Sequence, residues 1–366
     1  MVQRMDSLTV STPGRICLFG EHQDYLSLPV IPAAISLRVK VSGKPRNDAL
    51  VNIHLPDIQD EISFSLDGDL TYVLERDYFR SSINILRQNG FTFSRGFDCT
   101  VRGEIPIRAG TSSSSALVVT WIQFLALMSN QRAHLPPEIR ARYAHTAEVL
   151  EFGEPGGMMD QYATSLGGIL FIQFSPAISL RGLTSPLTSF VLGDSREAKD
   201  TKSILSRVKN SVSEVVQTIS RNHGEFTLQS AKEDELERYS KELNSEQYRL
   251  LRATVRNREL TFTALQLLSA PSVDEWKFGE LLNEHHRVLR DVLKISTPKI
   301  EAMLESALKA GAYGGKINGS GGGGCMFVYA PEHPERVAEA IEKAGGAPFI
   351  VRIDEGTRIE KDGELS

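Results

Sequence analysis

Four polar side chains follow the first apolar stretch of the chain within five positions, namely Glu21, His22, Asp24 and Tyr25. Arg15 lies near the start of that stretch. A carboxylate can accept two hydroxyl hydrogen bonds, and an imidazole can donate or accept one. The segment therefore suits a hydroxyl-rich ligand, although a polar turn after a strand would show the same pattern.

A run of serines precedes the most apolar stretch of the chain, residues 116–128. The run reads Gly110, Thr111, Ser112, Ser113, Ser114 and Ser115. Ser and Thr often begin helices, and the unpaired N–H groups and dipole of a helix start attract an anion. The pattern predicts a phosphate-binding loop whose hydroxyls can also ligate Mg²⁺. A flexible serine linker is the alternative, but a linker has no reason to begin a buried helix.

Two carboxylates lie near a loop of glycine and proline, residues 153–157. Asp160 follows this loop, and from there it can abstract or orient a proton. Glu148 precedes the loop on a predicted helix, where it can ligate a metal ion. Either residue could instead be an ordinary surface acid, and for Glu148 that alternative is favoured without further context.

A run of glycines, residues 319–324, separates two predicted strands. Glycine lets the backbone approach a ligand closely, and the candidate contacts are Gly319, Gly321 and Gly322. A floppy hairpin is equally compatible. The run contains the spacing of a dinucleotide fingerprint, but a strand follows where that fingerprint needs a helix, which counts against a dinucleotide-dependent oxidoreductase. Lys316 does not complete a Walker A loop, because Ile317 stands where Ser or Thr is required.

The composition is that of a soluble globular protein with roughly two domains. The chain has 366 residues, a formal net charge of −5 and three cysteines. The bulk charge does not favour nucleic acid as a partner, no apolar run is long enough to cross a membrane, and no secretory signal is seen. Few cysteines, odd in number, indicate buried thiols in a reducing compartment. We expect a cytoplasmic protein and leave its oligomeric state open.

The elements that must position these residues change in character near residue 190. Before it, strands alternate with helices and loops, including two short strands around a turn at Pro13-Gly14 and a helix over 137–150. After it, charged helices dominate, and we expect one of them over 230–268. We also expect a solvent-facing pair at His285-His286 and a frayed tail over 356–366.

Taken in order, these segments resemble the GHMP kinase superfamily over roughly residues 8–330. The segment 13–25 is most similar to the galactokinase signature PGRxNxxGEHxDY, with Cys17 in place of its Asn. The Asp160 segment is similar to the galactokinase form GxPxGxMDQ. The resemblance implies an α+β fold in two parts with the site between them. Residues 1–190 would form a part like the ribosomal S5 domain 2, and residues 191–366 a ferredoxin-like part.

The resemblance also implies ATP and Mg²⁺ as cofactors and a role for each motif. Arg15 and Asp160 would be the catalytic pair, and Ser114 and Glu148 the Mg²⁺ ligands. Glu21, His22, Asp24 and Tyr25 would bind a sugar. The serine run and the glycine run would enclose the phosphates. The implied activity is an ATP-dependent sugar kinase that acts on galactose or a related sugar, at the anomeric hydroxyl.

Several positions depart from the galactokinase pattern and leave the acceptor open. Leu26-Ser27-Leu28 replaces the usual Asn-Gly-Gly beside the sugar-facing residues, and Arg108 stands where the phosphate loop usually has Gly. Lys199 and Lys202 could reach a phosphate or an acidic substrate, although a solvated helix start is favoured. The alternatives are a kinase of a heptose phosphate, a fucose-like sugar or mevalonate, and a catalytically silent sugar sensor.

Overall fold

The computed structural model describes residues 7–107, 109–184, 186–198 and 200–360, so Arg108 and Lys199 lie outside the described residues. Within these ranges the strands form an eight-stranded and a four-stranded sheet. The first sheet has the order β12-β1-β2-β5-β3-β4, and β6 and β7 extend it from β2. Its strands are β1 (Leu8–Phe19), β2 (Ile31–Pro45), β3 (Leu50–Leu55), β4 (Asp60–Ser65), β5 (Phe97–Gly103), β6 (Ile169–Gln173), β7 (Ser179–Leu183) and β12 (Arg358–Glu360).

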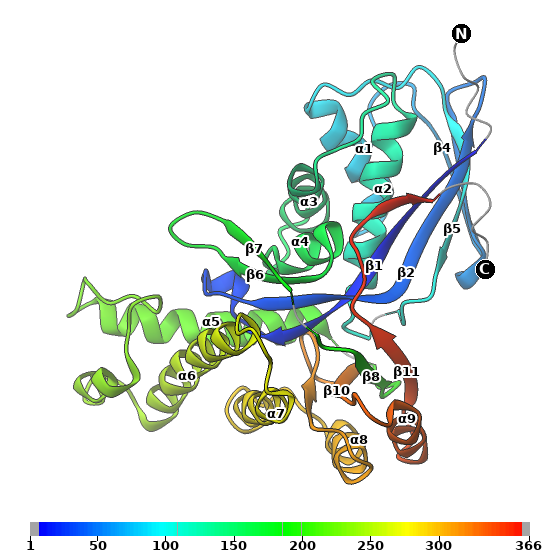
Figure 1. The fold of residues 1–366 in the computed structure, drawn as a ribbon. Coiled ribbons are helices and arrows are strands. Elements are labelled where there is room, and N and C mark those ends of the chain that lie inside the picture. The colour runs from blue at the N-terminus through cyan, green and yellow to red at the C-terminus, as the bar shows by residue number, and fades with distance from the viewer. Residues whose placement is uncertain (1–6, 108, 185, 199, 361–366) are drawn as a thin grey trace.

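Helices of the first half cover one face of this sheet (Figure 1). They are α1 (Tyr78–Gln88), α2 (Ser113–Met128), α3 (Pro137–His145) and α4 (Met159–Leu166). Helix α2 is apolar around most of its circumference, so it lies buried between the sheet and the other helices. The helix predicted over 137–150 is α3 followed by a π-helical turn, Thr146–Leu150, which carries Glu148.

The second sheet has the order β11-β8-β10-β9. Its strands are β8 (Ser189–Asp194), β9 (Gly314–Ile317), β10 (Cys325–Tyr329) and β11 (Ala347–Arg352), and its helices are α5 (Thr201–Ser220), α6 (Ser245–Leu268), α7 (Glu275–Asp291), α8 (Pro298–Lys309) and α9 (Pro334–Lys343). The single helix expected over 230–268 is wrong, because a 3₁₀ segment precedes α6 and Asn244 begins α6 with a capping box.

Strand β1 joins the two parts of the molecule. The expected turn at Pro13-Gly14 is instead a register shift within one continuous strand. The second half of β1 contributes Ile16 and Phe19 to a core that also contains Phe327 of β10. Because one strand runs from the first sheet into the core of the second part, residues at its C-terminal end lie where the two parts meet.

Two expectations about the second half are wrong. Within the tail, Arg358–Glu360 are ordered as β12, which pairs with β1 in the first sheet, while residues 361–366 lie outside the described residues. His285 and His286 are buried, and His285 stacks on Phe19. Helix α7 packs against both β9 and β1, so part of its charged sequence faces the interior. A domain boundary near residue 190 stays a prediction. Strand β12 follows that position in the chain but belongs to the first sheet.

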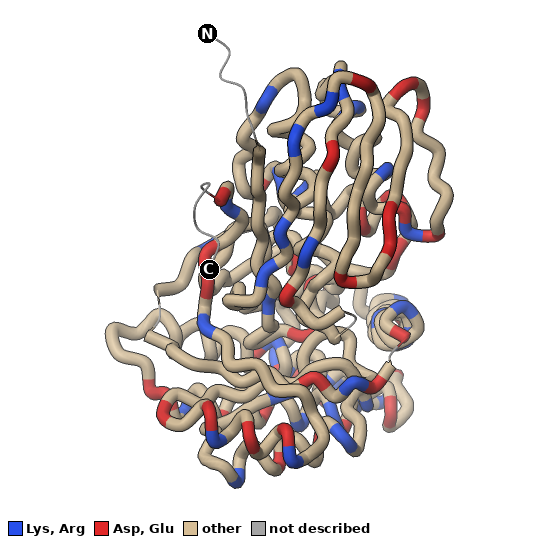
Figure 2. The backbone as a smooth tube through the Cα atoms, turned by 90° about the vertical axis from the view of Figure 1, so that its right-hand side faces the viewer, with Lys and Arg blue, Asp and Glu red and all other residues tan. Residues whose placement is uncertain are grey.

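Charges of both signs are interspersed along the helices at the bottom of Figure 2. With a net charge of −5, positive potential for an anionic ligand has to come from particular side chains and helix starts. None of the helices in the described ranges has the length and apolar character needed to cross a bilayer.

Candidate active site

Arg15 and Asp160 form a two-pronged ion pair across the first part of the molecule. Arg15 Nε and Nη2 each lie 2.8 Å from one oxygen of the Asp160 carboxylate, and Nη1 donates to Gly110 O at 2.6 Å. Ser112 Oγ donates to Asp160 Oδ2 at 2.7 Å. Burial opposes the charge of Arg15, but Asp160 and Glu21 outweigh it and raise the pKa of Arg15. The carboxylate is thus fixed by three donors while its side chain stays 28% exposed.

The serine run folds as the start of α2, as the sequence predicts. Ser112 precedes the helix in a left-handed conformation, with φ 61°, which is uncommon for a residue with a side chain. Arg15 N donates to Thr111 O at 3.1 Å, so β1 holds this loop by its backbone as well as by the Arg15 side chain. Ser113 is half-buried, Ser114 is exposed and Ser115 is buried. A helix start with free N–H groups and an exposed hydroxyl suits a phosphate.

Glu148 lies behind the serine run and is buried. Its Oε2 accepts a hydrogen bond from Gln161 Nε2 at 2.7 Å. Burial raises the pKa of Glu148, while hydrogen bonds from Ser114, Gln161 and Ser115 oppose that rise. Carboxylate and hydroxyl oxygens are suitable Mg²⁺ ligands. Within the described ranges, no group of three or more His, Cys, Asp or Glu side chains could hold a metal ion.

The loop of residues 20–28 follows β1 and carries the predicted sugar-binding residues, and is named the acceptor loop after that predicted role. His22 Nε2 lies 3.0 Å from Ser320 O and Nδ1 lies 2.6 Å from Tyr25 Oη. Because a carbonyl only accepts, Nε2 carries the proton and Nδ1 accepts from the tyrosine. Burial lowers the pKa of His22 to about 4. The imidazole is therefore neutral near pH 7 and links the acceptor loop to the glycine run.

Asp24 lies beside the loop of residues 153–157, which precedes Asp160. Its Oδ2 accepts from Met159 N at 3.3 Å, and a Cβ at Gly157 would lie 2.1 Å from the same oxygen. A side chain at position 157 would therefore force the Asp24 carboxylate to move. Burial, and then the charge of Asp160, raise the pKa of Asp24 to about 6.

Replacing Asp24 by asparagine should stabilise the fold at high pH while it weakens acceptor binding. The raised pKa of Asp24, about 6 against an ordinary 3.8, means that its contribution to stability is present at low pH and is lost as the pH rises through 6. We expect Asp24→Asn to raise the unfolding midpoint by about 2–4 °C at pH 8 and by progressively less toward pH 4. Thermal unfolding at both pH values measures this, and an equal shift at both would contradict it.

Glu21 is 2% exposed, and its Oε2 lies 2.7 Å from Nζ of the buried Lys316. A role in binding sugar hydroxyls stays a prediction for Glu21. One of its two carboxylate oxygens is already engaged by Lys316. Sequence reasoning considered Lys316 only as a Walker lysine and missed this pairing. The signal was weak, because the two residues are 295 positions apart.

The glycine run lies directly against the serine run, which is the predicted phosphate loop. A Cβ on Gly319 would come within 2.7 Å of Gly110 O. Asn318 Nδ2 donates to that carbonyl at 2.8 Å, and Cys325 N donates to Ala109 O at 2.6 Å. Gly319, Gly321 and Gly322 all have positive φ, which glycine adopts without strain. The structure thus brings the glycine run and the serine run together, and Asn318 is a contact that sequence reasoning missed.

Lys202 lies at the start of α5 and approaches the loop of residues 153–157, which precedes Asp160. Its Nζ is 3.7 Å from Glu154 Oε1, while Arg76 holds the same carboxylate with two contacts of 3.0 Å. The Lys202 side chain is 51% exposed. This geometry agrees with the favoured alternative of a solvated helix start.

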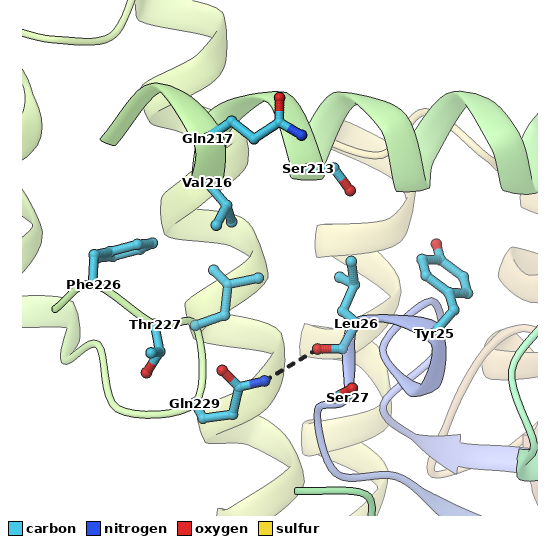
Figure 3. A pocket seen from close by; sticks show the side chains of 10 residues that line it. Tyr25, Leu26, Ser27, Ser213, Val216, Gln217, Phe226, Thr227 and Gln229 are labelled. Atoms are coloured by element: carbon cyan, nitrogen blue, oxygen red, sulfur yellow. Dashed lines mark hydrogen bonds between the residues drawn. The ribbon is translucent and has the colours of Figure 1, made fainter. Parts of the chain in front are cut away.

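A cavity of about 380 Å³ adjoins the acceptor loop (Figure 3). Leu26 and Ser27, two residues of the stretch that departs from the galactokinase pattern, line it together with Tyr25. Residues of α5 and of the segment 226–229 form its other walls, and Gln229 Nε2 donates to Leu26 O at 3.3 Å. Leu28 is buried among side chains of the same region. The unusual residues therefore attach the acceptor loop to the second half of the chain.

Comparisons with known proteins agree with this architecture. The family models for the GHMP kinases N terminal domain, the GHMP kinases C terminal region and the galactokinase galactose-binding signature match residues 77–168, 274–347 and 3–45. The chain is 31% identical over 363 residues to a mevalonate kinase of Thermococcus onnurineus, covering 96% of this chain and 98% of the relative. It is 30% identical over 326 residues to a galactokinase of Roseiflexus sp., covering 86% and 81%.

A solved structure gives the same picture of the fold. The crystal structure of Lactococcus lactis galactokinase complexed with galactose superimposes with a TM-score of 0.84, at 22% identity and over 97% of this chain and 95% of that one. The predicted α+β GHMP kinase fold is therefore confirmed. The relatives are kinases that match almost the whole chain, and on this evidence the protein belongs to the GHMP kinase family and is itself a kinase.

Proposed function

We propose that the protein transfers the γ-phosphoryl group of ATP to a hydroxyl of a sugar, galactose or a relative of it, at the anomeric position. The observation that carries the proposal is the arrangement of Asp160, which is held by Arg15 and Ser112 and lies next to Asp24 of the acceptor loop. One carboxylate can meet the attacking hydroxyl while the other binds a neighbouring hydroxyl.

Phosphoryl transfer asks the protein mainly to position the reactants and to offset charge. The start of α2 would hold the phosphates through its N–H groups, and the glycine run would close over them. Glu148 and Ser114 would hold Mg²⁺, which when bound neutralises phosphate charge. Asp160 would orient the acceptor hydroxyl or take its proton, and Arg15 would hold the Asp160 carboxylate in place.

An aromatic and aliphatic patch offers a place for the base of ATP. Phe152 packs against Tyr72 and Tyr78, with ring centroids 5.4 and 5.8 Å apart. Val73 and Leu74 beside them are exposed. Tyr78 lies within electrostatic reach of Glu148, whose charge adds to burial in raising the pKa of Tyr78. An aromatic and aliphatic surface beside the predicted phosphate site suits a purine ring.

Two observations favour different acceptors. The galactose-binding signature matches residues 3–45, and this segment holds His22 and Asp24, which supports a sugar. The relative at 31% identity is a mevalonate kinase, which makes mevalonate the second candidate.

A coupled ADP-release assay tests the proposal directly. The panel should contain galactose, other hexoses, fucose, a heptose phosphate and mevalonate, each with MgATP. ADP release with galactose or a related sugar supports the proposal, and release with mevalonate alone favours the second candidate. Calorimetric binding of a sugar without any ADP release would instead indicate a catalytically silent sensor.

Removing the charge of Glu148 should selectively weaken the apparent affinity of the enzyme for Mg²⁺. Glutamine keeps an oxygen that can accept from Gln161 but is a weaker ligand for Mg²⁺. We expect Glu148→Gln to raise the Mg²⁺ concentration for half-maximal ADP release by about 10–100-fold. The matched control is Glu138→Gln, which removes an exposed charge in α3. An unchanged Mg²⁺ titration in Glu148→Gln would remove this residue from the proposed metal site.

A further inference from the structure

Lys316 is a fully buried lysine at the end of β9, where the two parts of the molecule meet. Its Nζ lies 2.7 Å from Glu21 Oε2, 2.8 Å from Cys17 O and 2.8 Å from Ile317 O. An ammonium group has three protons to donate, so each one has an acceptor. A lysine that is satisfied in this way inside the protein has no donor left for a phosphate.

The three acceptors belong to the elements that build the candidate active site. Cys17 lies on β1, two positions after Arg15, and Glu21 directly precedes His22. Ile317 directly precedes Asn318, which accepts from Cys17 N at 2.9 Å and donates to Gly110 O at 2.8 Å. The ammonium therefore connects the acceptor loop, the strand that carries Arg15 and the segment that leads into the glycine run.

We propose that Lys316 is a positioning residue for phosphoryl transfer. It acts through Glu21: the ion pair fixes the start of the acceptor loop, and with it His22 and Asp24, relative to the phosphate loop. The inference rests on the proposed function, since it assumes that the acceptor loop binds the substrate. A buried ion pair is poor evidence for stability alone, because the cost of desolvation offsets the attraction. Here all three hydrogen-bond acceptors of the ammonium belong to segments that lead to the site.

Replacing Lys316 by methionine should impair the acceptor side of the reaction and spare the nucleotide side. The Glu21 carboxylate would stay buried without its partner and would move the acceptor loop. A displacement of about 1 Å can cost about 10²-fold in rate, so we expect kcat/KM for the acceptor to fall by about 10–100-fold. The KM for ATP should rise by less than the KM for the acceptor, because Arg15, and not Lys316, contacts the serine run directly. Lys316→Arg keeps the charge and should recover part of the loss.

A double variant separates positioning from stability. In Lys316→Met/Glu21→Gln no unpaired charge is left, so the unfolding midpoint should recover most of what the single variant loses. The kcat/KM for the acceptor should stay low, and the two substitutions should be non-additive. If Lys316 only stabilises the fold, catalytic efficiency will recover together with the midpoint, and the proposal is wrong.

The matched control is the ion pair of another buried cation, outside the site. Arg38 is 4% exposed and its Nη1 lies 2.7 Å from Asp354 Oδ2, where it ties the C-terminal segment to β2. Arg38→Met should lower the midpoint without changing the acceptor KM. The proposal is overturned if Arg38→Met reproduces the acceptor defect, or if wild type turns over and Lys316→Met leaves its acceptor kinetics unchanged. A wild-type chain that releases no ADP with any acceptor contradicts the proposed function itself, and this inference falls with it.

Discussion

Replacement of Asp160 by asparagine should lower kcat by about 10²–10⁴-fold, the range that general acid–base catalysis supplies. Asparagine keeps the size of the side chain and one oxygen, so Ser112 or Arg15 can still donate to it. It loses the negative charge that the two prongs of Arg15 meet at 2.8 Å, and it cannot accept a proton at any ordinary pH. The nucleotide should still bind, because Asp160 is not part of the serine run.

The size of the loss in this variant distinguishes two roles of Asp160. If the carboxylate takes the proton of the acceptor hydroxyl, the loss of kcat should lie near the upper end of the range. If it only orients the hydroxyl, the loss should lie near the lower end. The control is Asp354→Asn, which removes the carboxylate that pairs with the buried Arg38, outside the candidate site. Turnover like that of wild type in Asp160→Asn would exclude Asp160 from the catalytic pair.

The resemblance to the GHMP kinases, and not local pattern, implied that Arg15 and Asp160 meet. The two residues are 145 positions apart, and Arg15 lies within a strand while Asp160 lies in the first turn of a helix. The serine run could be recognised from local pattern, because the apolar stretch behind it has to be a buried helix, and a helix has a predictable start. Local pattern was sufficient for that loop.

The contacts between the two parts could not be read from local pattern. Lys316 looks like a strand lysine, and only its three-dimensional neighbours reveal the pairing with Glu21. The expectation for His285 failed for the same reason, since a helix with many charges normally faces water, whereas α7 packs against strands of both sheets. The short β12 has no distinctive pattern, and its place depends on Arg38, whose Nη2 donates to Gly356 O at 2.7 Å.

Replacement of Arg15 by lysine is the second substitution with a large expected effect, although it conserves the charge. Lysine is a point charge on a flexible stem, whereas the guanidinium is a planar fork. It cannot hold both oxygens of Asp160 and the carbonyl of Gly110 at once, as Arg15 does at 2.8, 2.8 and 2.6 Å. The Asp160 carboxylate and the phosphate loop would no longer be held by one side chain. We expect kcat to fall by about 10²–10³-fold, the cost of losing one well-placed donor in other enzymes.

A second arginine with the same geometry provides the control for this experiment. Arg46 grips both oxygens of Asp48 at 2.7 Å and reaches Asp98 at 2.7 Å, on the surface of the first sheet. Arg46→Lys should leave kcat and both KM values unchanged, because surface ion pairs contribute little. Arg15→Lys should keep the wild-type unfolding midpoint within about 2–4 °C while kcat falls. If it instead retains full turnover, charge alone is sufficient at position 15, and the fork to Asp160 and Gly110 has no part in catalysis.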